Sequence, residues 1–176
     1  MVQYRRNRVP GGTYFFTVTL RDRRATTLSE YIDALRAAFR ETLLERPFVM
    51  DAMVVLPDHL HAVWTLPQED VDYAGRWRSI KSRFTRALVK SDVELVRNVK
   101  GEYDLWQRRY WEHTIRDDVD LARHVDCIHF NLVKHGLVEQ VRDWPYSSFH
   151  LFVRRGLCAA DWAGVDMKSE NGGYGE

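Results

Sequence analysis

The sequence has few cysteines, little net charge and no long apolar run. Its two cysteines, Cys127 and Cys158, provide neither a disulfide framework nor the spacing of a metal site. No apolar stretch reaches the roughly 18 residues that a membrane span needs. The basic N-terminus lacks the apolar segment of a signal peptide. These absences indicate a reduced, cytoplasmic protein with no membrane partner.

A net charge of only +1 argues against a uniformly basic nucleic-acid-binding protein, although segregated charges would still permit one. The chain has 176 residues, of which 45% are hydrophobic and 29% are charged. This composition is typical of a folded protein, and this length suits one domain with a substantial core. We therefore predict a single domain over residues 1–165 and a disordered, polar tail over 166–176.

Hydrophobic periodicity predicts alternating strands and helices. Polar and apolar residues alternate in 13–20, with Phe15 as the exception, which predicts a strand with one buried face. Further strands are predicted at 48–56, at 59–66 and within 101–115. Apolar residues recur at helical spacing in 28–46, 73–90 and about 117–135. The β-α-β-β-α-β-α order predicts an α+β fold, with a ferredoxin-like antiparallel sheet, helices packed on one face and an added C-terminal helix.

Two histidines, His59 and His61, are the strongest local signal for chemistry. Residues two apart on a strand project from the same face, so both imidazoles point together while Leu60 points to the other side. Two neutral imidazoles form half of a divalent-metal site, which needs one or two more ligands from elsewhere. A bare pair of this kind is more often accidental, but its place at the start of an apolar strand favours a metal site.

Basic residues gather near the N-terminus and in the second predicted helix, where no acidic residue lies between Asp72 and Asp92. That helix would bury its apolar stripe and expose a basic ridge. Such a ridge suits a DNA backbone because lysine and arginine release condensed counterions, although a solvated helix face has the same pattern. The predicted DNA-binding residues are Arg5, Arg6, Arg8, Arg21, Arg76, Arg78, Lys81, Arg83 and Arg86.

The third predicted helix has an apolar stripe formed by Leu121, Val125, Ile128 and Leu132. Cys127 and Asn131 are four positions apart, so they share a different face of this helix. A side chain on that face is able to point toward the histidine pair.

Several separated motifs resemble one known family. Residues 57–61, Pro-Asp-His-Leu-His, are similar to the histidine–hydrophobic–histidine motif of the HUH nucleases and single-tyrosine transposases. Four other segments resemble motifs of the REP-associated tyrosine transposases: 11–18, 106–113, 143–150 and 161–164. The similarity extends from about Tyr4 to Gly164, and the motifs agree in order.

The resemblance implies an enzyme that cleaves and rejoins DNA. In this family two histidines and a polar side chain on the last helix hold Mg²⁺ or Mn²⁺, and a tyrosine of that helix attacks a phosphate to form a 5′-phosphotyrosine. Carried over to this sequence, the metal ligands are His59, His61 and Asn131. The implied partner is a REP hairpin with single-stranded flanks, and a monomer is favoured over a dimer.

One position departs from the family, because Cys127 stands where the nucleophilic tyrosine is expected. A thiol is shorter than a phenol and would not reach the same phosphate without movement. The favoured interpretation is a protein that binds DNA without cleaving it. Two alternatives are a cysteine nucleophile and a substitute tyrosine, for which the candidates are Tyr103, Tyr110 and Tyr146. A hydrolase that activates water is disfavoured, because the sequence has no obvious second metal site.

Overall fold

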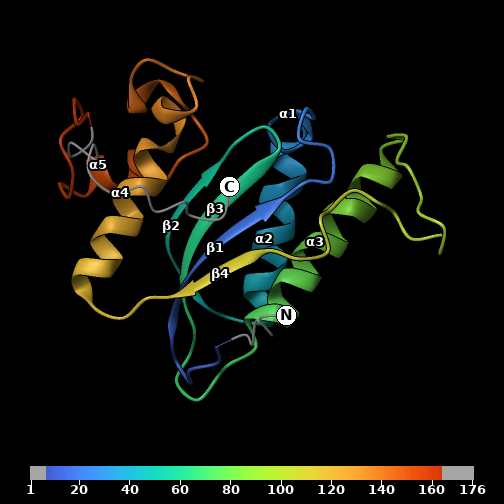
Figure 1. Cartoon of the computed structure of the whole chain (residues 1–176), viewed down its shortest axis with the longest axis horizontal. Coiled ribbons are helices and arrows are strands. Elements are labelled where there is room, and N and C mark those ends of the chain that lie inside the picture. The colour runs from blue at the N-terminus through green and yellow to red at the C-terminus, as the bar shows by residue number, and fades with distance from the viewer. Residues whose placement is uncertain (1–6, 164–176) are drawn as a thin grey trace, which may run out of the picture.

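A computed structural model describes residues 7–163 of the chain. Arg5, Arg6 and the tail predicted at 166–176 lie outside the described residues. The elements follow the order β1 (Thr13–Thr19), α1 (Thr27–Glu30), α2 (Ile32–Glu45), β2 (Val49–Val55), β3 (His59–Thr65), α3 (Tyr73–Lys90), β4 (Trp111–Thr114), α4 (Asp118–Lys134), the 3-10 helix η1 (Val141–Asp143) and α5 (Phe149–Arg154) (Figure 1). Among the described residues, no helix is long and apolar enough to cross a membrane.

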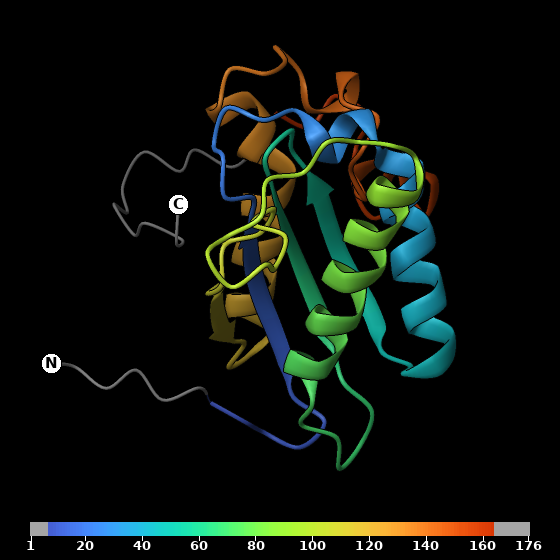
Figure 2. The ribbon, with the colours of Figure 1, turned by 90° about the vertical axis from the view of Figure 1, so that its right-hand side faces the viewer.

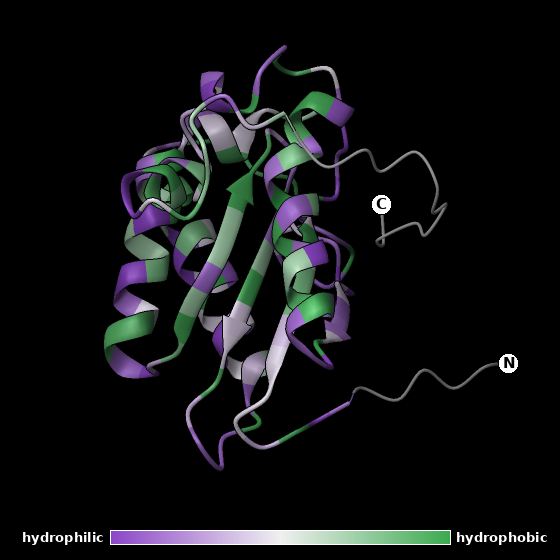
Figure 3. Ribbon diagram, turned by 90° about the vertical axis from the view of Figure 1, so that its left-hand side faces the viewer, coloured by the Kyte–Doolittle hydropathy of each residue, from purple (hydrophilic) through white to green (hydrophobic). Residues whose placement is uncertain are grey.

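The four strands form one sheet in the order β2-β3-β1-β4, and all neighbouring strands are antiparallel. This order confirms the ferredoxin-like prediction. Helices α2 and α3 lie side by side on one face of the sheet, while α4 lies on the other (Figures 1 and 2). Figure 3 views the molecule from the α4 side, and its helices carry both hydrophilic and hydrophobic residues.

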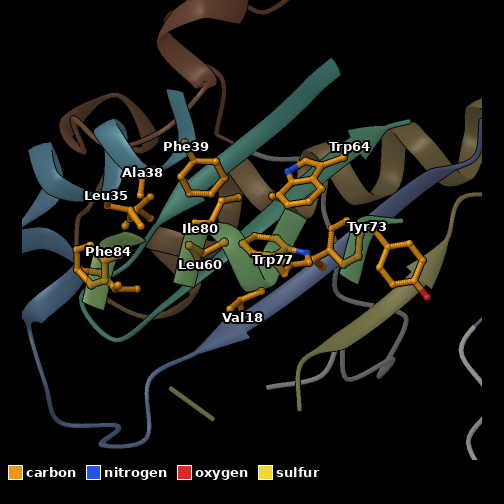
Figure 4. Close-up of a cluster of buried hydrophobic side chains, with 14 of the residues drawn as sticks. Val18, Leu35, Ala38, Phe39, Leu60, Trp64, Tyr73, Trp77, Ile80 and Phe84 are labelled. Carbon is orange, nitrogen blue, oxygen red and sulfur yellow. The ribbon is translucent and has the colours of Figure 1, made fainter. Parts of the chain in front are cut away.

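The larger core lies between the sheet and the pair α2 and α3 (Figure 4). Its centre is aromatic: the rings of Trp64 on β3 and Trp77 on α3 stack with their centroids 4.2 Å apart. Phe16 on β1 packs against both, with centroids at 4.9 Å and 5.4 Å. These contacts join α3 to the two central strands.

The second core lies on the opposite face and corrects one prediction. Phe15 is fully buried there, together with Val63 of β3 and with Ile128 and Leu132 of α4. Strand β1 is therefore buried on both faces, and the prediction of one buried face was wrong. Phe15, which breaks the alternation of polar and apolar residues, is buried because α4 covers this second face of the sheet.

Helix boundaries were predicted well where local signals mark them. α3 spans the predicted residues, and its N-terminus is capped by Asp72, whose side chain accepts a hydrogen bond from Gly75 N. α4 is capped by Asp117 and is followed by Gly136, which has a φ of 67° that glycine readily adopts. The helix predicted at 28–46 is instead divided at Tyr31 into α1 and α2.

Candidate metal centre and DNA interface

The register of β3 places both histidines on the face that α4 covers. His61 pairs with Thr17 of β1 on one side and with Val54 of β2 on the other, and His59 pairs with Thr19. Leu60, between them, belongs to the opposite core. The two imidazole rings have centroids 5.1 Å apart and are nearly perpendicular, at 86°. Both side chains thus converge at the end of β3 that follows the turn at Pro57 and Asp58.

Hydrogen bonds orient each ring through its Nδ1 atom. Asp58 Oδ1 lies 2.8 Å from His59 Nδ1, and Arg23 Nε lies 2.9 Å from Asp58 Oδ2. A carboxylate only accepts, so Nδ1 of His59 is the donor and Nε2 of the neutral ring keeps its lone pair. Thr17 Oγ1 lies 2.9 Å from His61 Nδ1. Such partners behind a ring are typical of metal-binding histidines, whose orientation they set.

The Nε2 atoms of His59 and His61 are buried, and neither has a hydrogen-bond partner among the described residues. Burying a polar atom without a partner costs free energy. Burial, followed by electrostatic repulsion from His59, His135 and Lys134, lowers the pKa of His61 well below its usual value. Burial also lowers the pKa of His59. Both rings are therefore neutral at neutral pH, as metal binding requires.

One stripe of α4 faces this pair. His135, at the end of the helix, lies with its ring centroid 5.4 Å from that of His59. Near the start of the helix, His124 packs on Phe15, whose ring stacks on His61 with centroids 5.5 Å apart. Cys127 and Asn131 fall between these two contacts at helical spacing and are only 9% and 1% exposed. Both residues therefore lie on the side of α4 that packs against the sheet face carrying the histidines.

Some of the predicted DNA-binding residues are buried or paired within the protein, and others are exposed. Arg76 is only 2% exposed, and its guanidinium donates hydrogen bonds to the carbonyl oxygens of Arg46, Pro47 and Asp72 and to the carboxylate of Asp70. As folded, this side chain is directed into the protein and cannot contact DNA. The prediction for Arg76 was wrong because its position on the helix faces the two chain segments that precede β2 and α3.

Two further residues of α3 are engaged within the protein. Arg83 forms ion pairs with Glu41 and Glu45 of α2. Lys81 donates to the carbonyl oxygen of Gln107 and lies over the ring of Trp106. The predicted residues with exposed side chains are Arg8, Arg21, Arg78 and Arg86. Because α3 lies on the face opposite to the histidines, Arg78 and Arg86 are not adjacent to the candidate metal site.

Other cations, which were not among the predicted site residues, lie beside the histidines. A pocket of about 300 Å³ is lined by His59, His135, Arg23 and Arg24, among other residues. The sequence signal for this pocket was the cluster of arginines at 21–24, whose proximity to β3 depends on the β1–β3 pairing. A phosphate group is small enough for such a pocket, and its charge complements these side chains.

Two of the three candidate substitute tyrosines lie on the opposite face of the sheet. Tyr110 and Tyr146 pack against the core between the sheet and α2 and α3, which is the face opposite to the histidines. Tyr103 lies in the connection between α3 and β4, with the guanidinium of Arg97 3.9 Å from its ring centroid. Tyr110 and Tyr146 therefore do not face a phosphate bound at His59 and His61.

Comparison with known proteins places this chain among transposases. The family model described as "Transposase IS200 like" matches residues 9–125. The chain therefore belongs to the IS200-like transposase family. This match ends just before Cys127.

More specific relatives are REP-associated tyrosine transposases. One from Escherichia coli K12 is 48% identical over 164 residues, covering 93% of this chain and 92% of the relative. A second, from Haemophilus influenzae, is 47% identical over 171 residues, covering 96% of this chain and 97% of the relative. A solved REP-associated tyrosine transposase bound to a REP hairpin has a TM-score of 0.87 and 46% identity, covering 100% of this chain and 98% of that one. Within its family, the chain thus groups with the REP-associated tyrosine transposases.

Proposed function

We propose that this protein binds REP-type hairpin DNA and holds a single-stranded flank against a Mg²⁺ or Mn²⁺ ion at His59, His61 and Asn131. The observation that carries the proposal is the pair of buried Nε2 atoms on His59 and His61, which have no hydrogen-bond partner among the described residues. A related protein that binds a REP hairpin has the same fold, which supports the choice of DNA as the partner.

The residues present fit such an ion. Two neutral imidazoles and the amide oxygen of the buried Asn131 offer the mixed nitrogen and oxygen ligands that Mn²⁺ accepts, and three protein ligands leave positions for a phosphate oxygen. When bound, the ion would polarise the phosphate. Asp58 and Thr17 hold the rings in place, while Arg23 and Lys134 supply positive charge beside them.

DNA contacts would then come from two groups of side chains. Arg23, Arg24 and Lys134, beside the histidines, suit the phosphates of the single-stranded flank. The exposed residues from the original prediction remain available for phosphates of the hairpin: Arg8, Arg21, Arg78 and Arg86. Phosphate contacts of this kind position DNA without reading its sequence.

Cys127 leads us to propose that this chain binds DNA without tyrosine-dependent cleavage. It occupies the place from which the family's nucleophile would act, and a thiol there is shorter than the phenol it replaces. The location of Tyr110 and Tyr146 supports the proposal, because neither of them shares a face with the histidines. A cysteine nucleophile is the second candidate, since Cys127 lies on the same stripe of α4 as Asn131.

The test is incubation of the purified chain with a labelled REP strand, its hairpin and Mn²⁺. We expect a shifted band on a native gel and no covalent protein–DNA adduct on a denaturing gel. The variant Cys127→Tyr is expected to restore the adduct, while Cys127→Ser, a matched control, is not. Failure of the unmodified chain to bind the hairpin would overturn the proposal. An adduct that forms with the unmodified chain and disappears in Cys127→Ser would establish the cysteine nucleophile instead.

A further inference from the structure

A cationic pocket lies beyond the outer edge of β2, on the side of the molecule where α5 packs (Figure 1). Its volume is about 480 Å³, and three arginines line it: Arg36 of α2, Arg142 of η1 and Arg154 of α5. The lining residues include one carboxylate, that of Asp143. We call this group of three arginines the arginine pocket. The sequence did not predict it, because Arg36 comes from an element far along the chain from the other two.

Most of the positive charge in this pocket is not neutralised by the protein. Arg36 pairs with Asp33 at 3.3 Å, but the two side chains are 55% and 92% exposed, so this pair contributes little. Within residues 7–163, neither Arg142 nor Arg154 forms an ion pair, and both side chains are exposed. Guanidinium groups stay charged at any ordinary pH, and like charges around one pocket repel each other. A bound anion would therefore relieve this repulsion.

Hydrogen bonds hold the wall of the pocket against the sheet. Val55 N donates to the carbonyl oxygen of Tyr146 at 2.9 Å, and Ser148 N donates to that of Met53 at 2.8 Å. Trp144 Nε1 donates to the carbonyl oxygen of Val55 at 2.9 Å. The segment 144–148 therefore extends the sheet beyond β2, and it separates Arg142 from Arg154 along the chain. Both arginines are thus anchored on either side of a fixed segment.

The same segment relates the pocket to the histidine pair. Ser147, which lines the pocket, forms an isolated bridge with Val54 of β2, and Val54 pairs with His61 of β3. Neighbouring strands are about 4.8 Å apart, so the backbone of Ser147 lies roughly 10 Å from that of His61. Successive nucleotides of one DNA strand in a duplex advance by about 3.4 Å, so this separation corresponds to roughly three nucleotides. DNA with one phosphate at the histidines is therefore able to place nearby phosphates at the arginine pocket.

The donors in the pocket suit phosphate oxygens. Guanidinium groups bind phosphates through two parallel N–H groups. Ser147 Oγ accepts a hydrogen bond from Phe149 N at 3.2 Å, so its own hydroxyl hydrogen is available to an anion. Because the arginine side chains are exposed, a phosphate that remains part of a DNA chain can reach them.

Two of the three arginines lie outside the part of the chain that matches the IS200-like family. That match ends at residue 125, before η1 and α5 begin. The solved relative that is bound to a REP hairpin is similar over 100% of this chain, which includes both elements. Arg142 and Arg154 therefore belong to a region that the chain shares with a protein that binds a REP hairpin.

We propose that Arg36, Arg142 and Arg154 form a second DNA-contact site, which holds backbone phosphates a few nucleotides from the phosphate at His59 and His61. The inference rests on the proposed function, because both sites hold the same DNA. One contact alone lets a strand turn about the metal site. Two contacts fix the direction in which the strand runs across the end of the sheet.

The test is titration of a labelled REP hairpin with its single-stranded flank, followed by fluorescence anisotropy at several salt concentrations with Mn²⁺ present. Each lost phosphate contact reduces the slope of log K against log salt by about 0.9. The variant Arg142→Gln/Arg154→Gln is therefore expected to reduce the slope by about 1.8. The same relation gives a loss of affinity of roughly 60-fold at 0.1 M salt, which disappears near 1 M.

Two further variants serve as controls. Arg97→Gln/Arg108→Gln removes the same charge from the connection between α3 and β4, on the opposite side of the molecule (Figure 1), and should leave the slope unchanged. Arg142→Lys/Arg154→Lys keeps the charge and should retain the slope, although bidentate hydrogen bonds are lost. The lysine variant also guards against a loss of folding.

The proposal is overturned if Arg142→Gln/Arg154→Gln binds with the slope of the unmodified chain, or if Arg97→Gln/Arg108→Gln reduces the slope as much. It is also overturned if the lysine variant loses as much of the slope as the glutamine variant, because the arginines would then have a structural role. Failure of the unmodified chain to bind the hairpin would overturn the proposed function, and this inference with it. An unmodified chain that binds, with no effect of the glutamine variant, would overturn this inference alone.

Discussion

Replacing Arg76 by methionine should lower the free energy of unfolding by about 3–5 kcal/mol, the cost of breaking a buried charged network. The guanidinium donates to the carbonyl oxygens of Arg46, Pro47 and Asp72 at 2.8–3.1 Å and to Asp70 at 2.7 Å. Hydrogen bonds to charged groups are each worth roughly 1.5–3 kcal/mol, but these values are not additive. Asp70 is 31% exposed, so water recovers part of the loss.

The measurement is thermal unfolding followed by circular dichroism, with urea unfolding as a second determination. For a chain of this size, each 1 kcal/mol moves the midpoint by roughly 2–4 °C, so a decrease of roughly 6–20 °C is expected. Arg78→Met is the matched control, because Arg78 lies on the same helix with its side chain exposed. That variant should change stability by less than about 0.5 kcal/mol.

A DNA-binding measurement distinguishes a structural role for Arg76 inside the protein from the DNA contact that the sequence predicted. At a temperature where both proteins are folded, Arg76→Met should bind a REP hairpin as tightly as the unmodified chain, because the guanidinium is inside the protein. A variant with unchanged stability and weakened DNA binding would refute the reasoning and would return Arg76 to the DNA interface.

Three further predictions concern the histidine pair and the carboxylate of Asp120 in α4. Thr17→Val removes the partner of His61 Nδ1 and should weaken Mn²⁺ binding by roughly 10–100-fold in a calorimetric titration; unchanged affinity would mean that the threonine does not orient the ring. Because burial lowers the pKa values of His59 and His61 below 6.5, Mn²⁺ affinity should persist as the pH falls through 6.5 and decline only at lower pH. A decline centred at or above pH 6.5 would contradict this. Burial alone would raise the pKa of Asp120, but hydrogen bonds from His113 and Arg116 lower it from 3.8 to about 2 in the folded chain. The carboxylate therefore stabilises the fold above pH 3.8 by roughly 2 kcal/mol, and this contribution is lost as the pH falls toward 2. Urea unfolding across this pH range should show the loss. The variant Asp120→Asn should be less stable at neutral pH and should lack this part of the acid dependence.

Features that depend on short-range periodicity were predictable from the sequence. The α+β order followed from alternation in the strands and from apolar spacing in the helices. The shared face of His59 and His61 followed from the two-residue period of a strand, which no distant contact alters. The helical period likewise predicted that Cys127 and Asn131, four residues apart on α4, share a face of the helix.

Burial of charged residues was not predictable in this way. Arg76 and Arg78 occupy the same basic helix, yet the first is buried and the second is exposed. The difference arises because the chain around Arg46 and Pro47 meets α3 at Arg76, and a contact across that sequence distance leaves no local pattern. The salt bridges between Arg83 and the glutamates of α2 depend on the same packing of two helices.

The position of α4 is the largest feature that only the tertiary structure decided. Its amphipathic pattern predicted a helix with a buried stripe, but a stripe does not specify which surface it covers. Once α4 packs on the sheet face that carries His59 and His61, Phe15, Cys127 and Asn131 are all buried. The residues that can carry the chemistry were therefore visible in the sequence. Which sheet face α4 covers depends on contacts between β3, β1 and α4, which the strand period of two residues and the helix period of 3.6 residues cannot encode.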